Sequence, residues 1–170
     1  MSDYLNKIKK FMIHEAYKFK KPKIVELGVR NGVSTELFLQ VCKKNKGRLT
    51  SIDINDYSKL FKDKIWKFIK SRDDNFVYLD KKLPKSIDII FLDTLHEAKH
   101  VEKIFYYYYK KLKVGGEFYI DDISWLPYLK NSIRNNFYCE INNYETFNTL
   151  LNIYNGNKKN FDIYFSFEYS

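Results

Sequence analysis

Residues 24–35, Ile-Val-Glu-Leu-Gly-Val-Arg-Asn-Gly-Val-Ser-Thr, constrain the fold more than any other stretch of the chain. Ile24 begins a short apolar run rich in branched side chains, which favours a strand buried on both faces. Gly28 and Gly32 allow the backbone to turn sharply and to approach a ligand closely. Ser34 stands where a helix would begin, so the first N–H groups of that helix would face the space above the strand. The stretch therefore predicts a strand, a glycine-rich loop and a helix.

The spacing of this loop argues against two common ligand motifs. It is neither Gly-x-x-x-x-Gly-Lys, which cradles phosphates, nor Gly-x-Gly-x-x-Gly, the dinucleotide fingerprint. The pattern is Glu-x-Gly-x-x-x-Gly and begins at Glu26. A carboxylate before the loop would repel a pyrophosphate but attract an amino group. The loop therefore favours a ligand that carries an amino group.

Length and composition predict a single-domain cytoplasmic protein. The 170 residues suit one domain, 1–170, with a substantial core. No run of 18 apolar residues occurs and the N-terminus is polar, so we predict neither a membrane partner nor a signal peptide. Cys42 and Cys139 are expected to be reduced thiols.

The net charge of +9 has two interpretations. It could mark a nucleic-acid or acidic-polysaccharide partner. However, the lysines are spread along the chain beside many Asn, Ile and Tyr residues, as in proteins encoded by AT-rich viral or bacterial genomes. We favour the compositional interpretation, with a nucleic-acid partner as the alternative.

Hydrophobic periodicity predicts alternating strands and helices. The expected helices cover residues 3–19, 34–44, 57–69, 97–112, 126–135 and 144–154. The expected strands cover residues 24–27, 49–53, 76–79, 87–92, 117–120 and 161–167. This order predicts an α/β fold of the Rossmann-like, doubly wound type, with an N-terminal helix and a mostly parallel sheet of about six or seven strands. Only residues 80–86 separate the third and fourth strands, so the helix between them is expected to be missing.

Acidic side chains stand at the ends of these expected strands. They are Glu26, Asp53, Asp80, Asp93, Asp121 and Asp122. A single acid after a strand more often caps the next helix, but a series favours a ligand site, because ligands of open α/β sheets bind at the carboxyl ends of the strands. Asp93 and Asp121 would end neighbouring strands roughly 5 Å apart, close enough to converge with Asp122. Three such anions require a proton or a cation between them.

Residues 23–123 resemble the class I S-adenosylmethionine-dependent methyltransferases, above all the catechol-type and the sugar- and antibiotic-tailoring O-methyltransferases. Three segments carry the resemblance: 26–34, the Ile-Asp-Ile-Ile-Phe-Leu-Asp-Thr-Leu-His of 87–96, and the Lys-Val-Gly-Gly-Glu-Phe-Tyr-Ile-Asp-Asp of 113–122. The resemblance implies S-adenosylmethionine as cofactor and a hydroxyl on a small molecule or saccharide as acceptor. It leaves the oligomeric state open, a homodimer included.

The resemblance also implies roles for individual residues. Ser34 would bind the carboxylate of the methionine portion, Asp53 both ribose hydroxyls, and Ile54 one face of the adenine. Asp80 would reach the edge of the adenine, although the short connection after it is at odds with the family pattern. The full cofactor-binding set implied is Glu26, Gly28, Arg30, Asn31, Gly32, Ser34, Asp53, Ile54, Asp80 and Asp93.

Asp93, Asp121 and Asp122 match the positions that hold a divalent metal, usually Mg²⁺, in the resembling families. Asp122 stands where the catechol enzymes carry asparagine, another oxygen ligand. His96 stands where those enzymes carry the catalytic lysine and where some tailoring enzymes carry histidine. Histidine accepts protons near neutral pH, so the resemblance makes His96 the general base, with Asp93 beside it as a catalytic residue. A helix-start histidine without a catalytic role is the alternative.

Two other functions stay open at this point. An RNA or DNA methyltransferase would need Lys and Arg clustered beside the pocket and binding that weakens steeply with salt. The sequence contains neither an Asn-Pro-Pro-Tyr-like motif nor more than isolated members of a Lys-Asp-Lys-Glu set. A non-catalytic domain would bind the cofactor without turnover. Residues 124–154 are expected to cover the acceptor side, but they contain no motif that identifies the acceptor.

Overall fold

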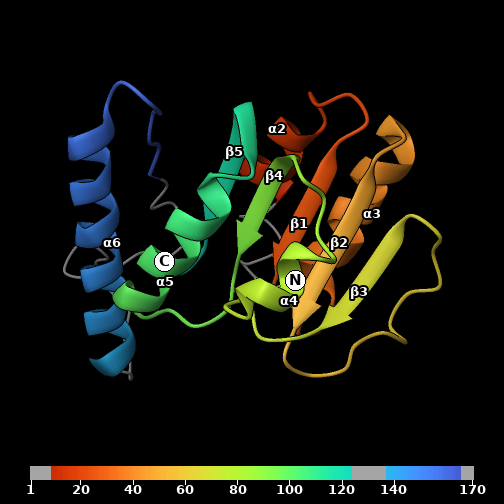
Figure 1. Ribbon diagram of the computed structural model, residues 1–170, viewed down its shortest axis with the longest axis horizontal. Coiled ribbons are helices and arrows are strands. Elements are labelled where there is room, and N and C mark those ends of the chain that lie inside the picture. The colour runs from red at the N-terminus through yellow and green to blue at the C-terminus, as the bar shows by residue number, and fades with distance from the viewer. Residues whose placement is uncertain (1–8, 124–136, 166–170) are drawn as a thin grey trace. The chain divides into compact units, whose positions relative to one another are not determined.

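The computed structural model describes residues 9–123 and 137–165 (Figure 1). They belong to two compact units. The first comprises the described residues of Met1–Thr94 and Tyr106–Asp121, and the second those of Leu95–Phe105 and Asp122–Ser170. The prediction of one domain over 1–170 stays a prediction. Among the helices described, none combines the length and the apolar character that a membrane crossing needs.

The first unit is built on a parallel sheet of five strands in the order β3-β2-β1-β4-β5, whose arrowheads point the same way in Figure 1. The strands are β1 (Lys23–Leu27), β2 (Arg48–Asp53), β3 (Trp66–Lys70), β4 (Ile87–Leu92) and β5 (Leu112–Ile120). β1 lies at the centre, where Ile24 pairs with Leu49 on one side and Ile89 on the other. The predicted α/β Rossmann-like class is confirmed, with fewer strands in the described chain than the predicted six or seven.

The predicted strand, loop and helix at the centre of the sequence are confirmed as β1, residues 28–32 and α3 (Val33–Asn45). Gly28 has φ +95°, and a Cβ added there would lie 1.9 Å from the carbonyl oxygen of Asp93. Gly32 has φ +74°, and its Cβ would lie 2.9 Å from the Phe61 ring. Both positions therefore require glycine, because a side chain would be strained and would collide with its neighbours.

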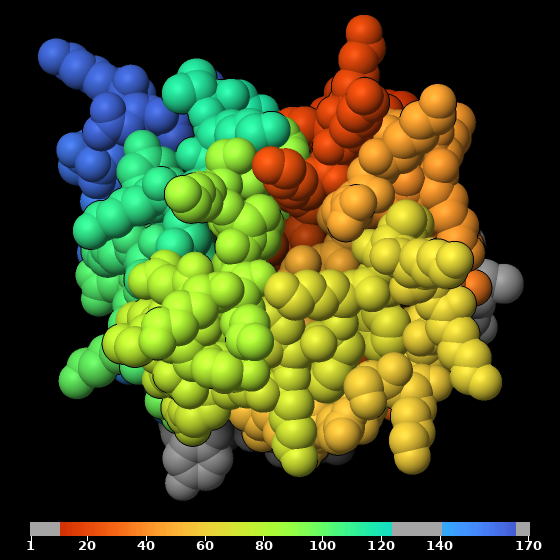
Figure 2. Space-filling model, turned by 45° about the vertical axis from the view of Figure 1, so that its right-hand side comes forward, coloured from red at the N-terminus to blue at the C-terminus, as the bar shows by residue number. Residues whose placement is uncertain are grey.

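The predicted helix over 57–69 is wrong. Residues 54–65 form a loop, shown in yellow beside the orange residues of α3 in Figure 2, and the segment ends as the edge strand β3. Asp56 Oδ1 accepts the Ser58 N–H at 3.0 Å, and Asp63 Oδ1 accepts the Ile65 N–H at 3.1 Å. These local side-chain hydrogen bonds favour turns and compete with the helical hydrogen bonds.

The predicted strand over 76–79 is also wrong, because these residues begin the short helix α4 (Phe76–Asp80). Leu79 is fully buried, and the Phe76 ring stacks on Tyr107 with centroids 3.8 Å apart, whereas Val77 is 76% exposed. The third strand thus ends at Lys70. The helix between strands three and four, which we expected to be missing, is α4.

α5 (Ala98–Tyr109) falls within the predicted helix 97–112, but β5 begins at Leu112. Gly115 and Gly116 both lie inside β5. There they coincide with a register shift against β4, at which the pairing passes from Ile87–Leu112 to Ile89–Glu117. The strand therefore starts earlier than the predicted 117–120.

The N-terminal part of the first unit contains a short π-helix, η1 (Lys9–Ile13), and α2 (His14–Ala16), within the predicted helix 3–19. They pack with α3 against the sheet, and α3 contributes the buried thiol of Cys42. Burial raises the pKa of Cys42 to about 12, so the thiol is neutral, and its predicted reduced state stays a prediction. The side chain of Cys139 lies outside the described residues.

In the second unit, α6 (Phe137–Asn157) contains the predicted helix 144–154 and continues through Gly156. Residues 161–165 are not a strand, and the rest of the strand predicted over 161–167 lies outside the described residues. So do residues 3–8 and the helix predicted over 126–135. Phe105 of α5 makes an edge-on contact with Phe161, with centroids 5.8 Å apart.

Candidate active site

Glu26 of β1 is fully buried beneath the glycine loop. Its Oε1 accepts the Ser34 hydroxyl at 2.6 Å, and its Oε2 accepts the hydroxyls of Thr35 at 2.8 Å and Ser51 at 2.6 Å. Trp66 Nε1–H donates in turn to Ser51 Oγ at 2.9 Å. This buried network connects β3, β2, β1 and the first turn of α3.

Burial raises the pKa of Glu26 to about 7, although the three hydroxyl donors, led by Ser34, act to lower it. The carboxyl group has no exposed surface on which a ligand could bind. The predicted direct contact of Glu26 with an amino group therefore has no geometric support here. Ser34 is also buried, and its single hydroxyl proton is donated to Glu26.

Asp53 stands at the carboxyl end of β2 and is fixed by the backbone around it. Its Oδ2 accepts the N–H of Val29 at 2.9 Å and of Arg30 at 3.4 Å, and its Oδ1 accepts the Asn55 N–H at 2.9 Å. The carboxylate thus holds the glycine loop against β2. It remains half-exposed, so part of its surface can meet a ligand.

The remaining predicted cofactor residues of the loop lie at the surface. Arg30 and Asn31 are exposed between the two glycines, and Arg30 has the left-handed φ of 48°. Ile54, directly after Asp53, is 62% exposed. An exposed isoleucine next to a fixed carboxylate has the placement that packing against an adenine would require.

Asp93 and Asp121 follow β4 and β5 at adjacent positions. Leu92 pairs with Ile120, the Asp93 N–H donates to Leu27 O at 2.9 Å, and the Asp121 N–H donates to Leu92 O at 3.0 Å. The sheet hydrogen bonding therefore continues to both aspartates. Asp93 is half-buried and Asp121 is buried, so the structure brings these two acids to one edge of the first unit as predicted.

His96 and Asp122, both in the second unit, lie next to each other. His96 Nε2 is 3.3 Å from Asp122 Oδ2. Asp122 has the left-handed φ of 51° and an exposed side chain, and His96 is half-buried. The imidazole and the carboxylate therefore lie within ion-pair distance of each other.

Asp80 does not stand at a strand end, which corrects the premise of its predicted role. It ends α4, where its Oδ1 accepts the Tyr107 hydroxyl at 2.7 Å and pairs with Lys111. The hydrogen bond from Lys111 holds the pKa of Asp80 below its usual range. An adenine contact of Asp80 is therefore not part of the proposed site.

Asp73 was not among the site residues predicted from the sequence. It follows the true third strand, is 7% exposed, and its Oδ2 accepts the Thr94 hydroxyl at 2.6 Å. Its carbonyl oxygen accepts the Tyr108 hydroxyl at 3.1 Å. The Trp-Lys-Phe-Ile-Lys alternation of residues 66–70 was the signal that could have placed this strand end.

The parallel sheet in the order 3-2-1-4-5, with a glycine loop after its central strand and acids at its carboxyl edge, is the fold of the S-adenosylmethionine-dependent methyltransferases. Residues 25–123, more than half of the chain, match the family model described as a methyltransferase domain. The chain belongs to this methyltransferase family, as the sequence predicted.

Solved structures support the fold. A Podospora anserina methyltransferase bound to S-adenosylhomocysteine aligns with TM-score 0.68 and 17% identity over 91% of this chain and 71% of its own. MycE, from the mycinamycin biosynthetic pathway, with Mg and S-adenosylhomocysteine, aligns with TM-score 0.57 and 20% identity over 66% of this chain and 30% of its own. A TDP-rhamnose 3'-O-methyltransferase of calicheamicin biosynthesis aligns with TM-score 0.51 and 12% identity over 67% of this chain and 60% of its own. Curated proteins gave no match. This chain thus spans less than a third of MycE.

Proposed function

We propose that this chain binds S-adenosylmethionine at the carboxyl edge of the first unit and transfers its methyl group to a hydroxyl of a small molecule or sugar. The methyltransferase family and the fold are established above, and the cofactor agrees with the S-adenosylhomocysteine, its demethylated product, bound in two of the similar structures. The oxygen acceptor rests on the sequence resemblance and on one similar O-methyltransferase.

The observation that most supports cofactor binding is the fixed carboxylate of Asp53. Because the Val29 and Asn55 N–H groups already hold it, the side chain loses little freedom when it accepts two ribose hydroxyls. Beside it, Ile54 offers an apolar face for adenine. The first N–H groups of α3 have no acceptor within the helix and suit the carboxylate of the methionine portion. When bound, S-adenosylmethionine supplies an activated methyl group, so the protein chiefly has to align acceptor and methyl donor.

The side chains of Asp93, Asp121 and Asp122 are of the kind that a divalent cation needs as ligands. Asp93 and Asp121 come to one edge at adjacent strand ends, and Asp122 follows Asp121 by one peptide bond. Carboxylate oxygens are the ligands that Mg²⁺ prefers, and MycE was solved with Mg. We therefore propose Asp93, Asp121 and Asp122 as its ligands. When bound, such a cation would lower the pKa of an acceptor hydroxyl. Asp122 would share its carboxylate between this role and His96.

The pairing of His96 with Asp122 supports the proposed proton transfer. As the acceptor oxygen takes the methyl group from sulfur, its proton would pass to the His96 imidazole, which Asp122 contacts. Asp122 would also hold the His96 imidazole in one orientation. A histidine without a function would not need a fixed orientation. Asp93, the second catalytic residue predicted from the sequence, would act by holding the metal that orients the acceptor hydroxyl.

One experiment tests the proposal in two stages. Calorimetry should show micromolar-range binding of S-adenosylmethionine, and Asp53→Ala should weaken it by about 1.5–3 kcal/mol, the scale of hydrogen bonds to a charged group. Asp53→Asn, which keeps one acceptor oxygen, should lose less. Transfer of labelled methyl is then measured on hydroxylated sugars and catechols, with matched amines as the competing acceptors.

In the second stage, His96→Ala should lower turnover by roughly 10²–10⁴-fold across pH 5.5 to 9 at saturating magnesium, without a change in cofactor affinity. Wild-type turnover in that variant would leave His96 a helix-start residue. Turnover that withstands a chelator would remove the metal from the proposal. Binding of the cofactor without transfer to any acceptor would favour the non-catalytic alternative, and transfer only to amines would replace the hydroxyl acceptor.

A further inference from the structure

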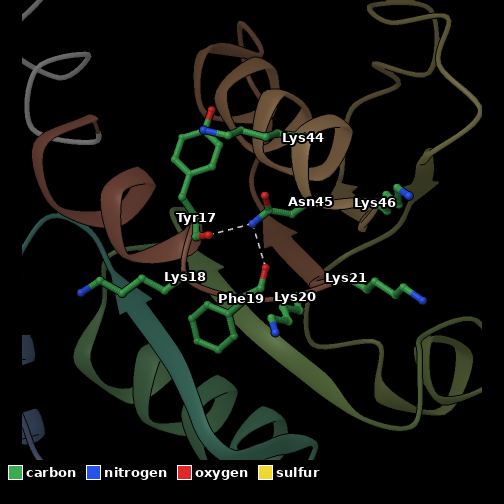
Figure 3. A pocket seen from close by; sticks show the side chains of 8 residues that line it. All are labelled: Tyr17, Lys18, Phe19, Lys20, Lys21, Lys44, Asn45 and Lys46. Carbon is green, nitrogen blue, oxygen red and sulfur yellow. Dashed lines mark hydrogen bonds between the residues drawn. The ribbon is translucent and has the colours of Figure 1, made fainter.

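A second charged site lies at the opposite, amino edge of the first unit's sheet. It is a surface pocket of about 380 Å³ between the segment that enters β1 and the end of α3 (Figure 3). Five of its eight lining residues are lysines and none is acidic; the eight are Tyr17, Lys18, Phe19, Lys20, Lys21, Lys44, Asn45 and Lys46. A concave surface of one charge is suited to a ligand of the opposite charge.

Hydrogen bonds hold the two walls of this pocket together. Asn45 Nδ2 donates to the carbonyl oxygens of Tyr17 and Phe19, both at 2.8 Å, as the dashed lines in Figure 3 show. In return, the Lys21 N–H donates to Asn45 O at 3.0 Å. The backbone that carries the lysines is therefore fixed before any ligand arrives.

The positive charge of the pocket is largely uncompensated. Lys18 pairs with Glu15, and Lys44 lies over the Tyr17 ring, 4.8 Å from its centroid. Within the described part of the chain, Lys20, Lys21 and Lys46 make no ion pair. The carboxyl end of α3 contributes only about half a negative charge, which is less than these lysines carry. Their mutual repulsion would be relieved by an anion.

Two of these lysines also occupy strained backbone positions. Lys21 has φ 49° and Lys46 has φ 57°, in the left-handed region that glycine adopts more easily. For lysine this conformation costs roughly 1–2 kcal/mol per residue. Lysine therefore stands at positions where glycine would favour stability, and a role for its charge explains that choice.

The lysines are arranged for a polymer rather than for one small anion. In Figure 3 their side chains fan out, with Lys18 on one side of the pocket and Lys21 and Lys46 on the other. No single phosphate can meet amino groups that point apart, but successive phosphates of a chain can. The first residues of β1 and β2 extend the basic surface, because the exposed Lys23 and Arg48 stand opposite each other in the register of these two strands.

We propose that this pocket binds the phosphodiester backbone of a single-stranded nucleic acid. Tyr17 and Phe19 pack partly against the core and expose the rest of their surface to the pocket, between the lysines. Aromatic surface beside basic side chains suits contact with unpaired bases. A membrane would present a flat surface to a concave one. β1 separates the pocket from the glycine loop by roughly 13 Å, at about 3.3 Å per residue, so this is a binding surface apart from the proposed methyl-transfer site.

Fluorescence anisotropy of labelled oligothymidylate and oligouridylate over a salt series tests the proposal. We expect micromolar-range binding at low salt that weakens steeply as salt rises. Lys20→Gln combined with Lys46→Gln should lower the affinity about tenfold and reduce the log–log salt slope by about 1.4, since each lost phosphate contact removes roughly 0.7. Lys81→Gln combined with Lys159→Gln removes the same charge from exposed lysines outside the pocket and should change the affinity less than twofold. Unchanged thermal unfolding would show that both variants are folded.

Binding of either oligonucleotide with a selective loss in the pocket variant supports the proposal. Equal losses in the two double variants would overturn it, because net charge alone would then explain binding. Binding to phosphatidylserine vesicles without binding to either oligonucleotide would also overturn it. Neither result depends on methyl transfer, so the proposal fails or holds independently of the proposed enzymatic function.

Discussion

The two edges of the first unit's sheet hold their charged groups in different ways. At the carboxyl edge, Asp53 accepts three backbone N–H groups, and Asp73 accepts the Thr94 hydroxyl. At the amino edge, Lys20 and Lys21 make no ion pair within the described residues and extend from the surface (Figure 3). The acids are thus fixed by the fold, whereas the lysines are fixed only at their backbone.

This difference indicates what kind of ligand each edge can select. A carboxylate that is already oriented loses little entropy on binding and can recognise a ligand of one shape. The ammonium groups of lysines stand on long, unrestrained side chains, so they recognise regularly spaced negative charges and not the shape of a ligand. Their binding depends on salt. The carboxyl edge therefore suits one defined cofactor, and the amino edge suits a flexible polyanion. Three substitutions sharpen this contrast.

Gly28→Ala should have the largest effect, because it acts where the carboxyl edge is rigid. The new Cβ would lie 1.9 Å from the Asp93 carbonyl oxygen, at φ +95°. We expect the free energy of unfolding to fall by roughly 3 kcal/mol or more in urea denaturation, with loss of cofactor binding. Gly115→Ala is the matched control, since Gly115 also has a positive φ but nothing lies within 4 Å of its added Cβ. Equal losses in the two variants would show that backbone strain, not the close approach to Asp93, makes glycine necessary.

Glu26 should give a smaller, pH-dependent effect. Its pKa rises from 4.5 to about 7 on folding, so between these values the folded chain binds more protons than the unfolded chain. The free energy of unfolding should therefore fall as pH rises from about 4.5 to 7, by something on the order of 3 kcal/mol. Glu26→Gln should remove this part of the pH dependence, measured by urea denaturation at several pH values. Glu36→Gln, an exposed change on α3, should leave it. A profile that is the same in the wild type and in Glu26→Gln would contradict the raised pKa.

Lys46→Gly should give the smallest effect, and in the opposite direction. Relief of the left-handed lysine at φ 57° should raise the free energy of unfolding by roughly 0.5–1 kcal/mol. Lys81→Gly is the control, because Lys81 has φ −78° and gains nothing from glycine. If Lys46→Gly destabilises the chain as much as Lys81→Gly, the left-handed conformation of Lys46 does not cost stability. One observation that supports a binding role for the pocket lysines would then be removed.

The sequence predicted the central part of the fold because its local and long-range signals agree there. The two glycines of the loop mark a sharp turn, and β1 and β4 are apolar runs that suit only a buried strand. The same agreement placed Asp53, Asp93 and Asp121 at one edge. Where the signals conflict, the predictions failed: residues 57–69 have helical periodicity, but Asp56 and Asp63 turn the chain locally.

Other site features could not be predicted because they depend on packing across the sheet. Glu26 was expected to contact the ligand. The sequence does not reveal that the hydroxyls of Ser34, Thr35 and Ser51 enclose its carboxyl group in the folded chain. The lysines were interpreted as a compositional bias because lysine is spread along the whole chain. Only the meeting of residues 17–21 with 44–46 brings five of them to one pocket.

The hydrogen bond from Trp66 has a spectroscopic consequence. Indole emission depends on the polarity and charge around the ring, and the Trp66 N–H is separated from Glu26 only by the Ser51 hydroxyl. The chain has one further tryptophan, Trp125, so a Trp125→Phe background would leave a single emitter beside the buried network. In that background the intrinsic fluorescence of the folded protein becomes an optical readout of whether the acid beneath the glycine loop carries its proton.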